Sequence, residues 1–202
     1  MVHPTRFDRA YFDRWYRNPR TCVLDRAEVT RRAALITSMA EYVLERRVRS
    51  ALDVGCGEAN WRAPLLELRP RLRYIGVDSS DYVVRRFGRL RNIIPGCAET
   101  LATLQLRTPF DLVIASGVLN FLSDRALSTA AREIARLTSG VAFLEIFTSS
   151  DDVVGDTRGW KRRSARHYRR LLKAAGLVQC GPHCYVSRTR AKTLAALEIG
   201  AP

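Results

Sequence analysis

Apolar and polar residues along the chain follow a pattern of alternating strands and helices. From residue 49 onward, short apolar runs of strand length are separated by stretches with apolar residues at helical spacing. The pattern predicts strands over 50–54, 72–77, 92–94, 110–115 and 140–147, and helices over 60–68, 80–87 and 124–137. Gly88 is expected to end the helix over 80–87. Strands that alternate with helices imply right-handed crossovers and a mainly parallel sheet.

The two ends of the chain depart from this alternation. An aromatic segment at 7–16 precedes a longer helix, for which Asp25 and Glu28 form a candidate capping box. A last helix is predicted over 164–175, followed by strands over 177–180 and 184–188 with a tight turn at Gly181 and Pro182. The sequence therefore predicts a single α/β domain with a mainly parallel seven-stranded sheet, a C-terminal antiparallel β-hairpin and helices on both faces.

The composition is that of an ordinary globular protein. The chain has 202 residues, of which 47% are hydrophobic and 27% are charged. No run reaches the roughly 18 to 20 apolar residues that span a bilayer, and residues 1–20 lack the apolar core of a secretory signal. We expect a cytoplasmic protein, a monomer or a homodimer, with no membrane partner.

Cysteine usage argues against disulfides and against a metal site. The five cysteines are an odd number without framework spacing, so we expect reduced thiols. Cys180, His183 and Cys184 form the sequence CGPHC, which resembles part of a zinc site. Zinc normally needs a fourth ligand and a partner cluster, and neither is evident. No metal is therefore expected.

The strongest chemical motif is a glycine loop after the first strand, in the sequence ALDVGCGEAN at 51–60. Gly55 and Gly57 allow the backbone to turn sharply off the strand and to approach a ligand closely. The third glycine of the dinucleotide fingerprint is absent, because Asn60 stands at its position. The loop therefore indicates a nucleoside-type ligand but not the usual pyrophosphate.

Two acidic residues sharpen this prediction. Asp53 lies inside the strand before the loop, where a carboxylate suits a cationic amino group better than a pyrophosphate. Asp78 ends the second strand, 21 residues after Gly57, where it can accept hydrogen bonds from both hydroxyls of a ribose. Asp53 and Asn60 together disfavour a nicotinamide-dependent dehydrogenase.

At this point the chain resembles the class I S-adenosylmethionine (SAM)-dependent methyltransferases over residues 49–188. LDVGCGEAN at 52–60 is similar to their glycine-rich loop, VDSS at 77–80 to their ribose-binding acid, and FDLVIAS at 110–116 to their fourth-strand motif. The resemblance implies a Rossmann-like core at 49–188, between an N-terminal helical cap at 1–48 and a C-terminal tail at 189–202. It implies SAM as the cofactor, contacted by Asp53, Gly55, Cys56, Gly57, Asn60, Trp61, Asp78, Ser79, Cys97, Ala98, Glu99, Ser116, Gly117, Val118, Tyr11 and Tyr16.

One of these positions departs from the family pattern. Family members often have an aspartate after the third strand that contacts the adenine amino group, whereas this chain has Cys97, a weak acceptor. Glu99 or a backbone carbonyl is the candidate substitute, and the Ala98 backbone N–H remains available to the ring. Trp61 fits either a cofactor wall or simple packing.

The methyl acceptor is not encoded in any motif. Candidate groups for a base or for orienting an acceptor are Glu145, Asn120 and His183. Trp15, Trp160, Lys161 and Arg162 are candidates for binding the substrate, because family sites lie beyond the strand ends. Residues 1–50 hold 11 basic and 6 acidic side chains, and residues 151–202 hold 11 and 4, so an acidic acceptor is one option.

Three functions remain open from the sequence. The first is methyl transfer to an oxygen or nitrogen of a small metabolite, acidic or not. The second is an RNA or DNA methyltransferase, which the net charge of +14 favours but which lacks an N/D-P-P-Y/F motif after the fourth strand. The third is a SAM-binding protein without catalysis, which the substitution at Cys97 and the absence of an obvious base keep open.

Overall fold

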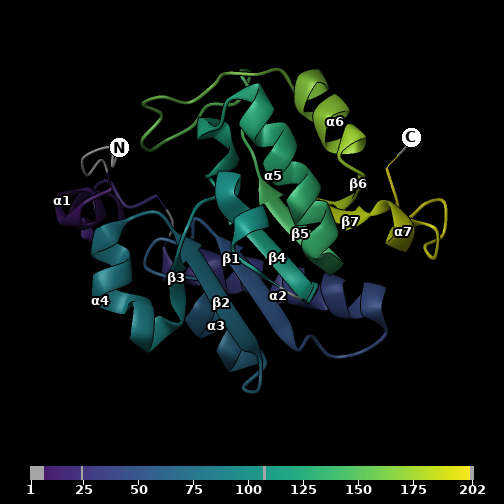
Figure 1. The fold of residues 1–202 in the computed structure, drawn as a ribbon, viewed down its shortest axis with the longest axis horizontal. Helices are drawn as coiled ribbons and strands as arrows, with labels where there is room; N and C mark the ends of the chain where they lie inside the picture. Colours follow the sequence, from purple (N-terminus) through teal and green to yellow (C-terminus); the bar gives the residue numbers. More distant parts are fainter. Residues whose placement is uncertain (1–6, 24, 107, 201–202) are drawn as a thin grey trace.

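The computed structural model describes residues 7–23, 25–106 and 108–200. At its centre is a seven-stranded sheet in the order β3-β2-β1-β4-β5-β7-β6 (Figure 1). The strands are β1 (Ser50–Val54), β2 (Arg73–Asp78), β3 (Ile93–Pro95), β4 (Phe110–Ser116), β5 (Thr138–Glu145), β6 (Leu177–Gly181) and β7 (Cys184–Ser187). Strands β1 to β5 pair in parallel, and β7 pairs antiparallel with both β5 and β6. The predicted parallel sheet with a C-terminal hairpin is confirmed.

Helices cover both faces of the sheet, as the sequence predicts. Helices α2 (Arg26–Leu44) and α3 (Arg62–Leu68) lie behind the sheet in Figure 1, and α5 (Asp124–Leu137) lies in front of it, beside α6 (Ala165–Ala174). Along β4 the side chains alternate: Leu112 and Ile114 join the core under α2, whereas Val113 and Ala115 join the core under α5. A strand buried on both faces explains why residues 110–115 form a continuous apolar run.

Side-chain caps set the beginnings of the long helices. The Asp25 carboxylate accepts a hydrogen bond from the Glu28 backbone N–H at 2.6 Å, and the Ser123 hydroxyl accepts one from Ala126 at 3.3 Å. These caps place the starts of α2 and α5 as the sequence indicates. The predicted helix over 124–137 is confirmed at both ends.

The prediction that Gly88 ends its helix is wrong. Helix α4 (Asp81–Arg91) continues through Gly88 and ends at Asn92, which adopts a left-handed conformation with φ of 54°. The Asn92 side chain also donates to the carbonyl of Tyr74 at 2.5 Å, which fixes the start of β3. Asparagine tolerates the left-handed region better than most residues with a side chain, so it replaces glycine as the terminator.

Two strand boundaries also differ from the prediction. Strand β5 begins directly after α5 and ends at Glu145, two residues earlier than expected at each end. In the hairpin, Gly181 is the last residue of β6, so Pro182 and His183 form the turn, with His183 at φ of 54°. The division of the chain into cap, core and tail stays a prediction.

The short elements lie at the edges of the sheet. They are α1 (Arg9–Phe12), the π-helix η1 (Asp13–Arg17), the 3-10 helices η2 (Ala98–Thr103) and η3 (Leu119–Phe121), and α7 (Arg188–Ala191). Figure 1 shows α1 close to α4, and the Phe12 ring stacks on Tyr82 of α4 at 5.7 Å. Across the described residues, no helix is both long enough and apolar enough to cross a membrane.

Candidate active site

The glycine loop leaves β1 at the edge where the parallel strands end. The backbone N–H groups of Gly55 and Cys56 donate to the carbonyl of Val77 at 2.7 and 3.1 Å, which ties the loop to β2. Gly55 and Gly57 have φ of 68° and 51°, in the region that favours glycine. A Cβ on Gly55 would collide with Val118, and a Cβ on Gly57 would collide with the Tyr16 hydroxyl. Both positions therefore need glycine for space as well as for conformation.

The two acidic residues flank this loop from neighbouring strands. The Asp53 carboxylate accepts a hydrogen bond from the Tyr74 hydroxyl at 2.6 Å and is 2% exposed. Burial raises the pKa of Asp53 to about 7, even though the Tyr74 bond acts in the opposite direction. The Asp78 carboxylate accepts from the backbone N–H groups of Gly57 at 2.7 Å and Ser80 at 2.8 Å. Burial also raises the pKa of Asp78 above its ordinary value.

A cavity of about 330 Å³ opens between this loop, the N-terminal segment and the loop after β5. Twelve of the residues predicted for the site line it, namely Tyr11, Trp15, Tyr16, Asp53, Gly55, Cys56, Asn60, Trp61, Ser116, Gly117, Glu145 and Trp160. Trp61 lines the cavity and also packs on Phe143 with ring centroids 5.3 Å apart. The cavity is thus built from the segments that the sequence indicates.

Aromatic residues of the N-terminal segment cover the glycine loop. Tyr16 lies against Gly57, and burial raises the pKa of Tyr16 well above its ordinary value, so its hydroxyl stays neutral. The segment is held in place by the carbonyl of Phe7, which accepts from Ser80 at 2.5 Å, and by Arg17, which pairs with Glu58. This segment therefore closes the end of the cavity nearest Asp78, the arrangement expected of a lid.

Glu145 belongs to a charged network at the end of β5. Its carboxylate accepts hydrogen bonds from the Ser116 hydroxyl and from Arg32, and Arg32 also pairs with Glu28 one turn earlier on α2. Glu145 is 5% exposed and lines the cavity, so its position agrees with the predicted role. Arg32 and Glu28 were missed by sequence reasoning, because they lie 113 and 117 positions before Glu145. Their spacing of four on one helix was the available signal.

The side chain of Asn120 forms hydrogen bonds within the protein. Its amide nitrogen donates to the Phe147 carbonyl at 2.7 Å and to the Tyr168 hydroxyl at 3.1 Å, and its oxygen accepts from the Phe147 N–H at 3.2 Å. Both N–H groups are thus committed, and Asn120 does not line the cavity. Asn120 thus joins η3 to the chain after β5, and its role in orienting an acceptor stays a prediction.

His183 also lies behind the cavity wall. It occupies the hairpin turn, with its ring 6.0 Å from the Phe143 ring and 6.5 Å from the Phe147 ring. Phe147 lines the cavity and His183 does not. The imidazole is therefore not placed to act directly on an acceptor in this arrangement.

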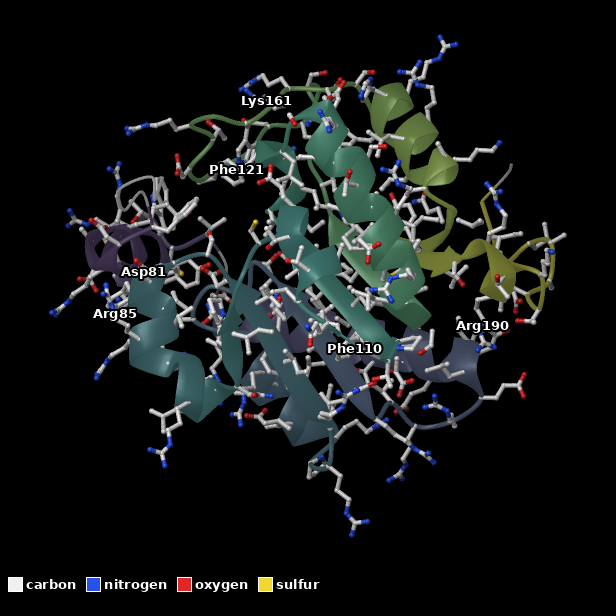
Figure 2. All side chains as sticks on the ribbon, in the orientation of Figure 1. Asp81, Arg85, Phe110, Phe121, Lys161 and Arg190 are labelled. Carbon is white, nitrogen blue, oxygen red and sulfur yellow. The ribbon has the colours of Figure 1, made fainter. Side chains whose placement is uncertain are left out.

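The two basic residues predicted to bind the substrate, Lys161 and Arg162, do not line the cavity. Lys161 and Arg162 are exposed, and Lys161 points outward at the edge of the molecule (Figure 2). The buried member of this run is Arg163, which donates to Asp124 at 2.7 Å and to the Leu122 carbonyl at 2.6 Å. The run thus anchors the loop to α5 through Arg163 and presents Lys161 and Arg162 to solvent, and substrate binding by these two residues stays a prediction.

The remaining predicted cofactor residues do not line the cavity: Gly57, Asp78, Ser79, Cys97, Ala98, Glu99 and Val118. Cys97 is half-buried, and its backbone N–H donates to the Thr100 hydroxyl at 3.0 Å. Ala98 is buried, whereas Ser79 and Glu99 are exposed. Adenine recognition by these residues stays a prediction.

Twelve further residues complete the cavity wall. They come mainly from the start of α2 and from the loop after β5: Cys22, Val23, Glu28, Val29, Arg32, Phe121, Phe147, Asp152, Val153, Val154, Gly155 and Asp156. All five cysteines are free thiols, and the described part of the chain has no cluster of three metal-ligating side chains. The chemistry of the cavity is therefore that of carboxylates and aromatic rings.

Comparison with known proteins agrees with this arrangement. Residues 52–140 match the family described as a methyltransferase domain. A trans-aconitate 2-methyltransferase from Azoarcus sp. (strain BH72) is 32% identical over 77 residues, which cover 38% of this chain and 30% of that protein. The match thus spans less than a third of the relative's length.

Solved structures share the fold at low sequence identity. A sugar N-methyltransferase from Streptoalloteichus is 20% identical with a TM-score of 0.62, covering 83% of this chain and 90% of the other. An O-methyltransferase of neocarzinostatin biosynthesis, solved with S-adenosyl-L-homocysteine and 1,4-dihydroxy-2-naphthoic acid, is 20% identical with a TM-score of 0.52, covering 81% and 57%. Residues 52–140 therefore match a methyltransferase domain, and the sheet has the Rossmann-like fold of the solved methyltransferases, in agreement with the resemblance seen in the sequence.

Proposed function

We propose that this chain is a SAM-dependent methyltransferase that acts on an oxygen or nitrogen of a small molecule. The observation that carries the proposal is the glycine loop, held to β2 and flanked by two buried carboxylates, at the mouth of a cavity lined with aromatic rings. When bound, SAM supplies an electrophilic methyl group on a sulfonium.

The residues present fit this cofactor. Gly55 lines the cavity through its backbone, and neither Gly55 nor Gly57 has room for a Cβ, so the loop can lie close to a ligand. Asp53 offers a buried carboxylate to the amino group of the methionine moiety, and Asp78 offers free lone pairs to the ribose hydroxyls. The aromatic wall excludes water from the acceptor, so donor and acceptor are held together in a dry, aligned arrangement.

A small acceptor suits the dimensions of the cavity, which is about 330 Å³. The exposed basic side chains that favoured a nucleic acid in the sequence lie outside this cavity, as Lys161 and Arg162 do. These observations support a small-molecule methyltransferase over an RNA or DNA methyltransferase.

Calorimetric titration with S-adenosylhomocysteine (SAH), followed by transfer of labelled methyl from SAM to an acceptor panel, tests the proposal. We expect SAH to bind and at least one small acceptor to be methylated. Binding without turnover on any acceptor would favour the SAM-binding protein without catalysis. No binding of SAH to the folded chain would refute the cofactor assignment.

The pH dependence of SAH binding gives a further prediction. Because the pKa of Asp53 is raised to about 7, this group is neutral below that pH and must lose a proton to pair with a cationic amino group. We expect SAH affinity to fall about tenfold from pH 8 to pH 6, as linkage to one proton requires. Tyr16, Tyr74 and Cys56 surround Asp53, and their raised pKa values keep them neutral across this range.

Asp53→Asn is the control for this titration. The amide keeps the shape of the side chain but has no charge to gain, so we expect weaker binding that no longer changes with pH. Calorimetry at pH 6, 7 and 8 on both proteins measures the effect. A wild-type affinity that stays constant over this range would show that Asp53 does not pair with the amino group.

A further inference from the structure

The wall of the cavity carries an excess of negative charge. Five carboxylic residues line it, and within the described part of the chain Arg32 is the one basic residue that does so; the acids are Glu28, Asp53, Glu145, Asp152 and Asp156. The net charge of the whole chain is +14, so this acidic lining opposes the overall balance. The charge that lines the cavity is therefore opposite in sign to the net charge of the chain.

Arg32 is not available to bind an anionic acceptor. Its guanidinium lies between two carboxylates, Glu28 and Glu145, and donates to both. The side chains of Arg32 and Glu145 are 28% and 7% exposed, so the Glu145 end of this network is buried and the Arg32 end is partly exposed. One cation held by two anions leaves a net negative group at the end of β5, where a carboxylate or phosphate on the acceptor would be repelled.

Aromatic rings form another part of the cavity wall. The Phe147 and Trp160 rings stack with centroids 5.8 Å apart at 12°, and Phe121 meets Trp160 edge-on at 5.8 Å. The faces of such rings attract a cation that has left water. The Trp160 Nε1 atom is buried and has no hydrogen-bond partner among the residues described, so it offers one donor to an oxygen of the acceptor.

We infer that the methyl acceptor is a small amine, which enters as a cation and binds between the Glu145 network, Asp152 and the aromatic wall. The inference rests on the proposed function, since it names the substrate class of the same cavity. Carboxylates together with aromatic faces are the combination that recognises an ammonium group. An anionic acceptor finds neither a free cation nor a free guanidinium on this wall.

The reaction then proceeds at nitrogen. The ammonium first loses a proton through a carboxylate of the wall to solvent, which frees the nitrogen lone pair. That lone pair forms the new N–C bond as the C–S bond breaks, and the electron pair of the broken bond stays on sulfur. The products are the methylated ammonium, SAH and one proton, so charge and atoms balance.

Matched pairs of amines and carboxylates on one skeleton test the inference by calorimetry with SAH-saturated protein. The pairs are 2-phenylethylamine with 3-phenylpropionate, cyclohexylmethylamine with cyclohexylacetate, and 6-amino-6-deoxyglucose with glucuronate. We expect the amine to bind at least about tenfold more tightly than its partner wherever a pair binds. Tighter or equal binding of the carboxylate, or binding of no amine, would overturn the inference. Failure of SAH itself to bind would instead overturn the proposed function.

Two neighbouring aspartates provide a matched pair of variants. Asp152 is exposed and lines the cavity, whereas the Asp151 carboxylate accepts from the Thr148 N–H at 2.6 Å and does not line it. We expect Asp152→Asn to weaken amine binding about fivefold and to leave SAH binding unchanged, because one charge is removed from the acceptor side. Asp151→Asn should change neither. Equal effects of the two variants would mean that the loop acts through its general charge, which contradicts a specific amine site.

Discussion

Replacement of Gly55 by alanine is expected to lower SAH affinity at least about 100-fold and to destabilise the fold by about 3 kcal/mol. The backbone at this position has φ of 68°, where an alanine is strained. The new methyl group would also collide with the side chain of Val118, at the end of β4. Either the loop keeps its shape and the strain lowers stability, or it shifts and the cradle is lost. Calorimetry and urea denaturation measure the two outcomes.

Two variants separate the strain from the collision. Gly176 has φ of 86°, has nothing within 4 Å of an added Cβ and does not line the cavity, so Gly176→Ala carries the strain alone and should cost about 1 kcal/mol of stability. Val118→Ala removes the side chain that the new methyl group at residue 55 would meet. The double variant Gly55→Ala with Val118→Ala should therefore recover part of the affinity for SAH that Gly55→Ala loses. If Gly176→Ala abolishes SAH binding as completely as Gly55→Ala, the close approach at Gly55 is not the cause.

Much of the fold was predictable because its local signals agree with its tertiary packing. The strand over 50–54 and the helix over 124–137 were predicted at their observed bounds, since each combines a clear apolar pattern with a cap or a glycine turn. Gly88 misled the prediction because glycine is a frequent helix terminator. At this site Asn92 can end the helix through its own hydrogen bond to Tyr74, and a bond to another strand leaves no trace in the local pattern.

In the candidate site, too, the features that local sequence signals predict differ from those that depend on contacts between distant segments. The glycine loop and its acids follow from one strand and its neighbour, so motif spacing places them together. The network of Glu28, Arg32 and Glu145 joins α2 to the end of β5, and only the folded chain brings these residues into contact. The negative charge that lines the acceptor cavity was therefore not predictable from the net charges of the sequence segments. The basic run at 161–163 lies in the right loop, but its side chains point to solvent or to α5.

Asp78→Ala is expected to weaken SAH binding by about 3 kcal/mol, or roughly 150-fold, because hydrogen bonds to a charged acceptor are strong. Each carboxylate oxygen of Asp78 accepts one backbone N–H, from Gly57 or Ser80, and keeps a lone pair for a ribose hydroxyl. The N-terminal segment, through Phe7 and Tyr16, covers this carboxylate, so we expect the segment to move aside as the ribose enters.

Loss of the carboxylate also leaves two backbone donors without partners, so lower affinity alone does not prove contact with the ribose. An SAH analogue that lacks both ribose hydroxyls resolves this ambiguity. We expect wild-type protein to bind the analogue about as weakly as Asp78→Ala binds SAH, and the variant to show no further loss with the analogue. If the loss of affinity from Asp78→Ala and the loss from removing the ribose hydroxyls add in full, Asp78 shapes the glycine loop without contacting the ribose. The cofactor would then be held through Asp53 and the loop backbone, and the pH dependence of binding would persist in Asp78→Ala.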